Sequence, residues 1–195
     1  MTSKQCIVHT GGWEGVRSHP AMAWMEKYTA FFDRRDYDSL SSWHSPSYTY
    51  TKSTGETFSS GDASNKAVVE TYAPFRANLH DPKFLVVWET EKGWEMFGVA
   101  VLYADLVAEG EKKVRVEISA IEVPFHPDKP VQATDQSGKQ WDLAIPSAFK
   151  FRYVKDDAAE HDGILMESTS IFSDPTSAVV EMLKRGMLKP EQLMG

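Results

Sequence analysis

The spacing of apolar residues changes near Pro82, from the period of a helix to the period of a strand. Before this point, apolar side chains recur three and four residues apart, as on the buried face of an amphipathic helix. This spacing, with Ser18 as a cap and Pro20 in the first turn, predicts a first helix with a broad apolar face. A short second helix is predicted over 36–43, and a third opens at Asp62.

The third predicted helix carries its apolar residues in a regular stripe. They fall at i, i+4, i+7 and i+11, namely Val68, Tyr72, Phe75 and Leu79. The stripe predicts a helix that continues to the end of this series, and Pro74 is expected to bend it or to end its regular hydrogen bonding. His80 then lies in the turn to the next strand, where we expect it to cap the preceding carbonyl groups.

Beyond Pro82, β-branched and aromatic residues gather in short runs that turn sequences separate. The runs predict strands at 84–90, 94–107, 114–125, 149–153 and 164–172, in addition to an earlier strand at 48–51. The first three of these runs predict an antiparallel meander. Residues 127–147 are expected to form a small hairpin insertion with its turn at 136–139, and Asp174-Pro175 begins a terminal helix.

The order of these elements, helices first and antiparallel strands afterwards, is an α+β layout. A strongly curved sheet wrapped around the N-terminal helices would bury the apolar faces most economically. The chain has 195 residues, enough for one domain, which we place at 18–195. Residues 1–17 carry several glycines and are predicted to be a flexible leader.

The segment from His161 to Pro175 contains a turn, one strand and an Asp-Pro helix start. This closing pattern resembles that of SnoaL-like proteins in the nuclear-transport-factor-two-like superfamily. The resemblance implies a cone-shaped, curved antiparallel sheet around the N-terminal helices, with a pocket inside and a homodimer formed through the outer face. It also implies a cofactor-independent enzyme of isomerase, cyclase or dehydratase type, acting by proton transfer on a hydrophobic, natural-product-like small molecule. The superfamily includes members that only bind ligands or proteins, so the alternative is a non-catalytic binding or dimerisation module.

Polar side chains on otherwise apolar faces are the candidates for chemistry, because burying such a group is costly unless it has a partner or a role. Glu122 and His126 share a face of the 114–125 run and its extension, and a carboxylate beside an imidazole can serve as a general base. The alternative is a pair at the strand end that faces water. Tyr103 could donate a hydrogen bond to a developing oxyanion, or be a core residue with a satisfied hydroxyl.

Asp33 follows Phe32 and precedes an Asp-containing short helix. Here the chain resembles scytalone dehydratase, which carries a Tyr-Asp pair at this place and a histidine on a later strand. The carboxylate is kept, the tyrosine is replaced by Phe32, and the strand histidine aligns with Trp88. The resemblance therefore implies that Asp33 is an acid or base in the pocket. An ion pair with Arg34 or Arg35 in solvent is the alternative.

Five further side chains are predicted to line the pocket and bind substrate: Tyr28, Tyr48, Tyr50, Trp88 and Glu167. Tyr28 lies one helical turn before Phe32, and the others lie on predicted strands. Core packing is the alternative for the aromatic residues. A change of register by one residue would turn any of the strand residues to the opposite face of the sheet.

Composition excludes several classes of partner. The chain has 21 basic and 28 acidic residues, for a net charge of −7, and no run of lysines or arginines interleaved with aromatics. A nucleic-acid partner and an anionic membrane surface are therefore not expected. The six histidines and the single cysteine, Cys6, show no metal-ligand spacing, and no nucleotide-binding motif is present. We expect a protein without metal or cofactor, and a cytoplasmic location fits the lack of any intramolecular disulfide and of a signal-like N-terminus.

Overall fold

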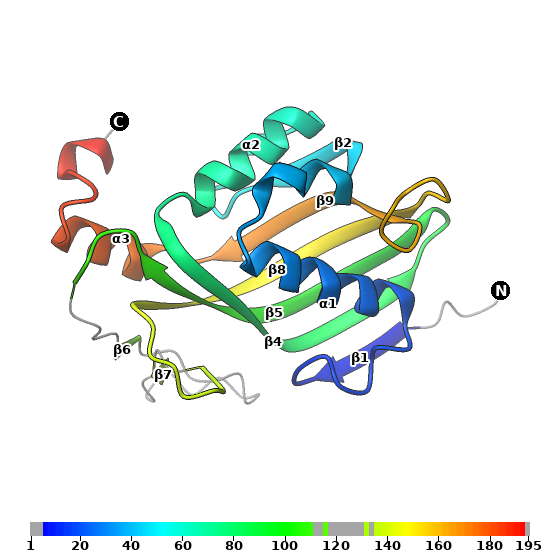
Figure 1. Cartoon of the computed structure of the whole chain (residues 1–195), viewed down its shortest axis with the longest axis horizontal. Helices are drawn as coiled ribbons and strands as arrows, with labels where there is room; N and C mark the ends of the chain where they lie inside the picture. Colours follow the sequence, from blue (N-terminus) through cyan, green and yellow to red (C-terminus); the bar gives the residue numbers. More distant parts are fainter. Residues whose placement is uncertain (1–5, 111–114, 117–130, 133–134, 194–195) are drawn as a thin grey trace.

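A computed structural model describes residues 6–110, 115–116, 131–132 and 135–193. Within this part of the chain, one long curved sheet carries helices α1 and α2 on the same face (Figure 1). The fold is thus α+β, as predicted. The predicted catalytic residues Glu122 and His126 lie outside the described residues, as does most of the predicted 114–125 strand.

The large sheet has seven strands in the order β1-β4-β5-β8-β9-β2-β3. The strands are β1 (Cys6–Thr10), β2 (His44–Thr51), β3 (Thr57–Phe58), β4 (Phe75–Glu89), β5 (Gly93–Leu106), β8 (Leu143–Lys155) and β9 (Ile164–Ser173). A separate two-stranded pair joins β6 (Arg115–Val116) to β7 (Val131–Gln132). All neighbours in the large sheet are antiparallel except β2 and β9, which run parallel. The expectation of a purely antiparallel sheet is therefore wrong at this pair, where the chain between the strands is long enough to allow either direction.

The predicted leader differs from the structure at residues 6–10. These residues form β1, which pairs antiparallel with β4 so that Val8 lies opposite Val86. The segment contains three β-branched residues, Ile7, Val8 and Thr10, and it covers the outer edge of β4. This pairing satisfies backbone N–H and C=O groups along the edge of β4, which could otherwise form hydrogen bonds with a strand of another chain.

Helix α1 (Pro20–Asp33) packs its apolar stripe against the concave face of the sheet. Pro20 is at the start of the helix as predicted, but the N-cap residue is His19 rather than Ser18. The short helix η1 (Tyr37–Trp43) follows, and α2 (Gly61–Tyr72) begins with Ser60 accepting a hydrogen bond from the backbone N–H of Ala63. No described helix has the length and apolar character that crossing a membrane requires.

Helix α2 ends at Tyr72 and β4 begins at Phe75, so of the two effects expected of Pro74 the end of the helix is confirmed, and the apolar stripe does not continue as a helix to Leu79. Proline has no N–H for the helix, and it also disfavours the helical conformation in the residue before it. The last two members of the apolar stripe, Phe75 and Leu79, pack instead on opposite faces of the sheet, because a β-bulge lies between Phe75 and Ala77. His80 consequently lies within a strand.

The two faces of the sheet can be assigned from the core. On β5, Met96 and Ala100 pack with α1 in the main core and point to the concave face. Val101 and Tyr103 alternate with these and form a separate cluster with Trp141 on the convex face. Side chains that lie opposite one another on paired strands share a face, so this assignment extends across the sheet.

The C-terminal region confirms the predicted strand and helix. Strand β9 occupies Ile164–Ser173, and α3 (Thr176–Lys184) follows directly. Asp174 Oδ1 accepts a 2.9 Å hydrogen bond from the backbone N–H of Thr176, and Gly186 adopts a positive φ of 69° after the helix. A final short helix, η2 (Pro190–Leu193), ends the described chain.

Candidate active site

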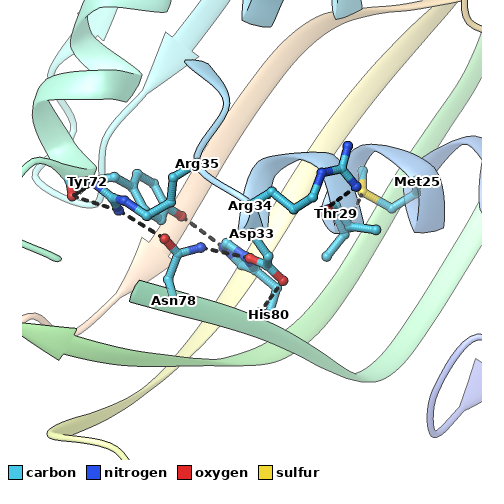
Figure 2. A network of polar contacts seen from close by, with 9 residues as sticks. Met25, Thr29, Asp33, Arg34, Arg35, Tyr72, Asn78 and His80 are labelled. Carbon is cyan, nitrogen blue, oxygen red and sulfur yellow. Dashed lines mark hydrogen bonds and ion pairs between the residues drawn. The ribbon is translucent and has the colours of Figure 1, made fainter. Parts of the chain in front are cut away.

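Asp33, the last residue of α1, directs its carboxylate at strand β4. Its Oδ1 accepts hydrogen bonds from Asn78 Nδ2 at 2.7 Å and from His80 Nδ1 at 2.6 Å, and its Oδ2 accepts one from the backbone N–H of His80 at 3.0 Å. Figure 2 shows these three side chains pointing toward one another. The neighbouring arginines, predicted as alternative partners, donate elsewhere: Arg34 to the carbonyl of Ala30, and Arg35 to Asn78 and the carbonyl of Tyr72.

The contacts of His80 define its tautomer. A carboxylate can only accept, so Nδ1 carries a proton and donates a hydrogen bond to Asp33, and in the neutral ring Nε2 is then the acceptor. The hydroxyl of Tyr72, at the end of α2, lies 3.0 Å from Nε2. Burial raises the pKa of Tyr72 well above its usual value, so its phenol stays protonated and can donate this bond at neutral pH. The three side chains form a line from carboxylate through imidazole to phenol.

This line, the Asp33–His80–Tyr72 relay, is partly open to solvent. The side chain of His80 is 25% exposed and that of Asp33 is 13% exposed. Phe32 lies edge-on to both His80 and Tyr72, with ring centroids 5.8 and 4.7 Å away. Across the sheet, His80 lies opposite Leu102, which in turn lies opposite Ile145. The imidazole therefore has an aromatic and aliphatic surrounding on the concave face.

The structure places two predicted site residues away from Asp33. Tyr103 points to the convex face, where it packs with Val101 and Trp141, and burial raises the pKa of its phenol. Trp88 lies opposite Glu95, which also points to the convex face. Trp88, the residue aligned with the strand histidine, therefore does not meet Asp33, and the histidine that does is His80, eight residues earlier.

Tyr28 and Tyr48 are close together but fully within the core. Tyr28 Oη lies 2.9 Å from Nε2 of His44, and Tyr48 stacks on the His44 ring with centroids 3.8 Å apart. The other ring nitrogen of His44 bonds Asn65 Oδ1 at 2.5 Å, and burial lowers the pKa of His44 to about 4. Both tyrosines are buried, which is the predicted core alternative rather than an open pocket wall.

Tyr50 is also buried, and its hydroxyl donates to Thr71 Oγ1 at 3.4 Å. Glu167 lies on the convex face, 3.8 Å from Arg152, which also pairs with Glu95 at 3.0 Å. These charged side chains line an open hollow of about 600 Å³ together with hydroxyl-bearing residues of β2 and β9. Glu167 thus lines a hollow, but on the opposite side of the sheet from Asp33.

Three residues that meet at this site were not predicted as site residues: His80 and Tyr72, which belong to the relay, and Asn78. Asn78 and His80 are two residues apart, so a strand at this place would have put both on one face beside the predicted Asp33. This two-residue spacing was not recognised as a strand pattern, because the apolar spacing up to Leu79 predicted a helix. Among the described residues, no group of three or more His, Cys, Asp and Glu side chains is arranged to hold a metal ion.

Sequence comparison finds no relative: no family model matches the chain, and no curated protein matches it. Solved structures do match. Aln2 from a Streptomyces species has 10% identity and a TM-score of 0.56, over 86% of this chain and 97% of that one. A Novosphingobium aromaticivorans protein provisionally named scytalone dehydratase has 10% identity and a TM-score of 0.53, over 83% and 87%. The hexachlorocyclohexane dehydrochlorinase LinA-type3 of Novosphingobium barchaimii has 11% identity and a TM-score of 0.50, over 82% and 87%.

At this level of identity the likeness concerns the fold alone. It agrees with the curved sheet and the helices on its concave face, and it extends over most of each chain. The protein therefore has the α+β cone fold of SnoaL-like proteins in the nuclear-transport-factor-two-like superfamily.

Proposed function

We propose that the protein is a cofactor-independent acid–base enzyme in which His80 is the general base. The observation that carries this proposal is the 2.6 Å contact between Asp33 Oδ1 and His80 Nδ1, in a partly exposed site on the concave face. A carboxylate bonded to one imidazole nitrogen fixes the tautomer, so the other nitrogen can accept a proton. The same carboxylate stabilises the imidazolium that forms.

In this mechanism Nε2 of His80 takes a proton from an acidified C–H bond of the substrate. The electron pair of that bond then forms a double bond to the adjacent carbon. In an elimination, a leaving group departs from that carbon with its own bonding pair. In an isomerisation, the π pair of the double bond that the adjacent carbon already carries moves to the next carbon, which takes the proton back from the imidazolium. Neither sequence consumes an oxidant or reductant, so the site needs no redox cofactor.

Tyr72 occupies the hydrogen-bonding position that the substrate proton must reach. The proton arrives either through the Tyr72 hydroxyl, which passes its own proton to Nε2, or directly after that hydroxyl turns away. In both cases Tyr72 contacts the reacting atoms. Because burial holds the pKa of Tyr72 high, it acts as a neutral phenol and not as a phenolate.

The substrate we propose is a hydrophobic small molecule that loses water or hydrogen chloride, or shifts a double bond. The aromatic and aliphatic neighbours of His80, Phe32 and Leu102 among them, favour an apolar ligand over a charged one. Two structural neighbours are named as a dehydratase and a dehydrochlorinase, and both names denote eliminations.

A small substrate panel tests this function. It contains a β-hydroxy ketone, a chlorinated cycloalkane and a β,γ-unsaturated ketone, with products separated by chromatography. For whichever compound turns over, Asp33→Asn and His80→Gln are expected to lower kcat at least about 100-fold, the usual contribution of a positioned general base. Tyr103→Phe, on the convex face, is the matched control and should leave kcat unchanged. Turnover that survives His80→Gln would refute His80 as the general base, and a wild-type protein that turns over none of the compounds would favour the non-catalytic binding module.

We also propose that a second copy of the chain covers the convex face of the sheet. Exposed apolar side chains of this face lie on three strands, Val8 on β1, Phe97 on β5 and Phe172 on β9. Charges of both signs lie beside them on β5, β8 and β9, namely Glu95, Lys150, Arg152 and Glu167. A face that carries both exposed apolar side chains and charges of both signs can complement itself in a two-fold interface.

Light scattering coupled to gel filtration tests this association. The wild-type protein should have twice the mass of one chain, and Phe97→Glu should have the mass of one chain, because it adds a buried like charge beside Glu95 in each subunit. Val180→Glu, an exposed position on α3 away from this face, is the control that should remain a dimer. A wild-type mass equal to one chain would refute the proposal.

A further inference from the structure

Arg35 lies directly after α1, the helix that carries Asp33, and has an unusual backbone conformation. Helix α1 ends at Asp33, Arg34 is its C-cap, and Arg35 follows with a φ of 62° in the left-handed region. This position after a helix is most often glycine, because any side chain is strained there. An arginine in this conformation therefore needs contacts of its own side chain to offset the strain.

One such contact fixes the orientation of the Asn78 amide. Arg35 Nη1 donates to Asn78 Oδ1 at 3.1 Å, while Asn78 Nδ2 donates to Asp33 Oδ1 at 2.7 Å. A guanidinium can only donate and a carboxylate can only accept, so the amide fits between them in a single orientation. Arg35 thus fixes which end of Asn78 faces Asp33, and with it one of the donors that hold the carboxylate.

The second contact reaches the other end of the relay. Both terminal nitrogens of Arg35 donate to the backbone carbonyl of Tyr72 at 3.3 Å. The guanidinium also lies 5.2 Å from the ring centre of Tyr37, within range of a cation–π contact. Figure 2 shows Arg35 reaching from the end of α1 to Tyr72 and Asn78, which stand on α2 and β4. One side chain therefore joins the three elements that carry Asp33, His80 and Tyr72.

We propose that Arg35 is a positioning residue whose forked guanidinium fixes the relative positions of the two ends of the Asp33–His80–Tyr72 relay. The inference rests on the proposed function for its significance, but its geometry can be tested without a substrate. Lysine cannot replace Arg35, because a single ammonium group lacks the planar fork that bonds two acceptors at once.

The test follows the His80 Nδ1 proton by NMR in the full-length protein. A proton held between an imidazole and a carboxylate gives a downfield signal that exchanges slowly with water, and His80→Gln identifies it by its loss. Arg35→Gly removes the side chain and relieves the backbone strain, so the fold should be retained. The exchange rate of the proton should rise about tenfold or more, as expected for weakening a charge-assisted hydrogen bond. Arg34→Gly is the matched control and should leave the rate unchanged.

Methylguanidinium added to the Arg35→Gly protein supplies the missing group from solution. We expect it to slow the exchange again, while ethylammonium, which has the charge but not the fork, should not. Equal exchange rates in the Arg35→Gly and Arg34→Gly proteins would overturn the role of Arg35 and leave the relay intact. A wild-type spectrum that His80→Gln does not change would overturn the relay, and the role of Arg35 with it.

Discussion

The hydroxyl of Tyr72 lies 3.0 Å from Nε2 of His80, on the side of the imidazole opposite Asp33. Both nitrogens of the ring are therefore engaged, and in the neutral ring one is a donor and the other an acceptor. A histidine in this state has no free lone pair for a reagent from solution, although a quarter of its side chain is exposed. Tyr72 thus controls access to the atom that we propose as the base.

Replacing Tyr72 with phenylalanine should expose this atom. Diethyl pyrocarbonate acylates unprotonated imidazole nitrogens, so Tyr72→Phe should raise the modification rate of His80 by at least about fivefold, the equivalent of one ordinary hydrogen bond. Mass spectrometry of the peptide that contains His80 measures the rate separately from the other histidines. Tyr103→Phe is the control, since its hydroxyl stands on the convex face. Equal rates in the two variants would contradict a hydrogen bond that covers Nε2.

Much of the fold could be predicted because local sequence and tertiary packing agree there. The apolar spacing of α1, the turn between β4 and β5, and the Asp-Pro start after β9 each specify an element through its own residues. The segment 73–83 was misjudged because Phe75 and Leu79 continue the spacing of α2 by coincidence. Pro74 ended the helix, and the β-bulge beyond it turned these two side chains to opposite faces.

Of the two residues in the proposed acid–base pair, only Asp33 could be predicted from the sequence. Asp33 was predicted from the resemblance to scytalone dehydratase, whereas His80 depends on a strand whose register is set by two bulges. Bulges arise from packing across the whole sheet and leave no clear mark in the sequence. The same register turned Tyr103 and Trp88 outward, since a strand residue and its neighbour always face opposite sides.

The buried ion pair between Arg185 and Asp142 should anchor the C-terminal helix to the sheet. Their side chains are only 4% and 3% exposed, and Nη1 lies 2.9 Å from Oδ2. Arg185→Met leaves a buried carboxylate without its cation and should lower the free energy of unfolding by about 3 kcal/mol. Chemical denaturation measures the change. Arg17→Met breaks a solvent-exposed pair with Glu26 and should leave stability unchanged. Similar midpoints for both variants would contradict an anchoring role.

Gly98 should tolerate no side chain, because it lies where three groups meet on the concave face. A Cβ at this position would stand 2.5 Å from Phe149 Cζ, 2.7 Å from the carbonyl oxygen of Phe84 and 2.9 Å from Leu85 Cδ2. The carbonyl belongs to the backbone of the paired strand and cannot move away alone. Gly98→Ala should therefore destabilise the protein by about 1–3 kcal/mol. Gly12→Ala, with open space around the glycine, is the matched control in the same thermal unfolding measurement.

His44 should make stability fall as the pH is lowered below neutrality. In the folded protein its Nδ1 donates to Asn65 and its Nε2 accepts from Tyr28, an arrangement that only the neutral ring can make. Burial lowers the pKa of His44 to about 4, against about 6.5 in an unfolded chain. Between these values the unfolded chain binds the proton and the folded protein does not, so acidification favours unfolding.

The sign and size of the effect follow from this difference. Above about pH 6.5 the ring is neutral in both states and contributes no pH dependence, and below about pH 4 both states are protonated. In between, the free energy of unfolding should fall by about 1.4 kcal/mol per pH unit, or about 3 kcal/mol in total. Denaturant titrations of wild type and His44→Gln at each pH isolate this contribution, because the other titrating groups are common to both proteins. The difference in free energy of unfolding between wild type and His44→Gln should shrink steadily from about pH 6.5 to about pH 4. A difference that stays the same over this range would show that His44 is not buried in its neutral form.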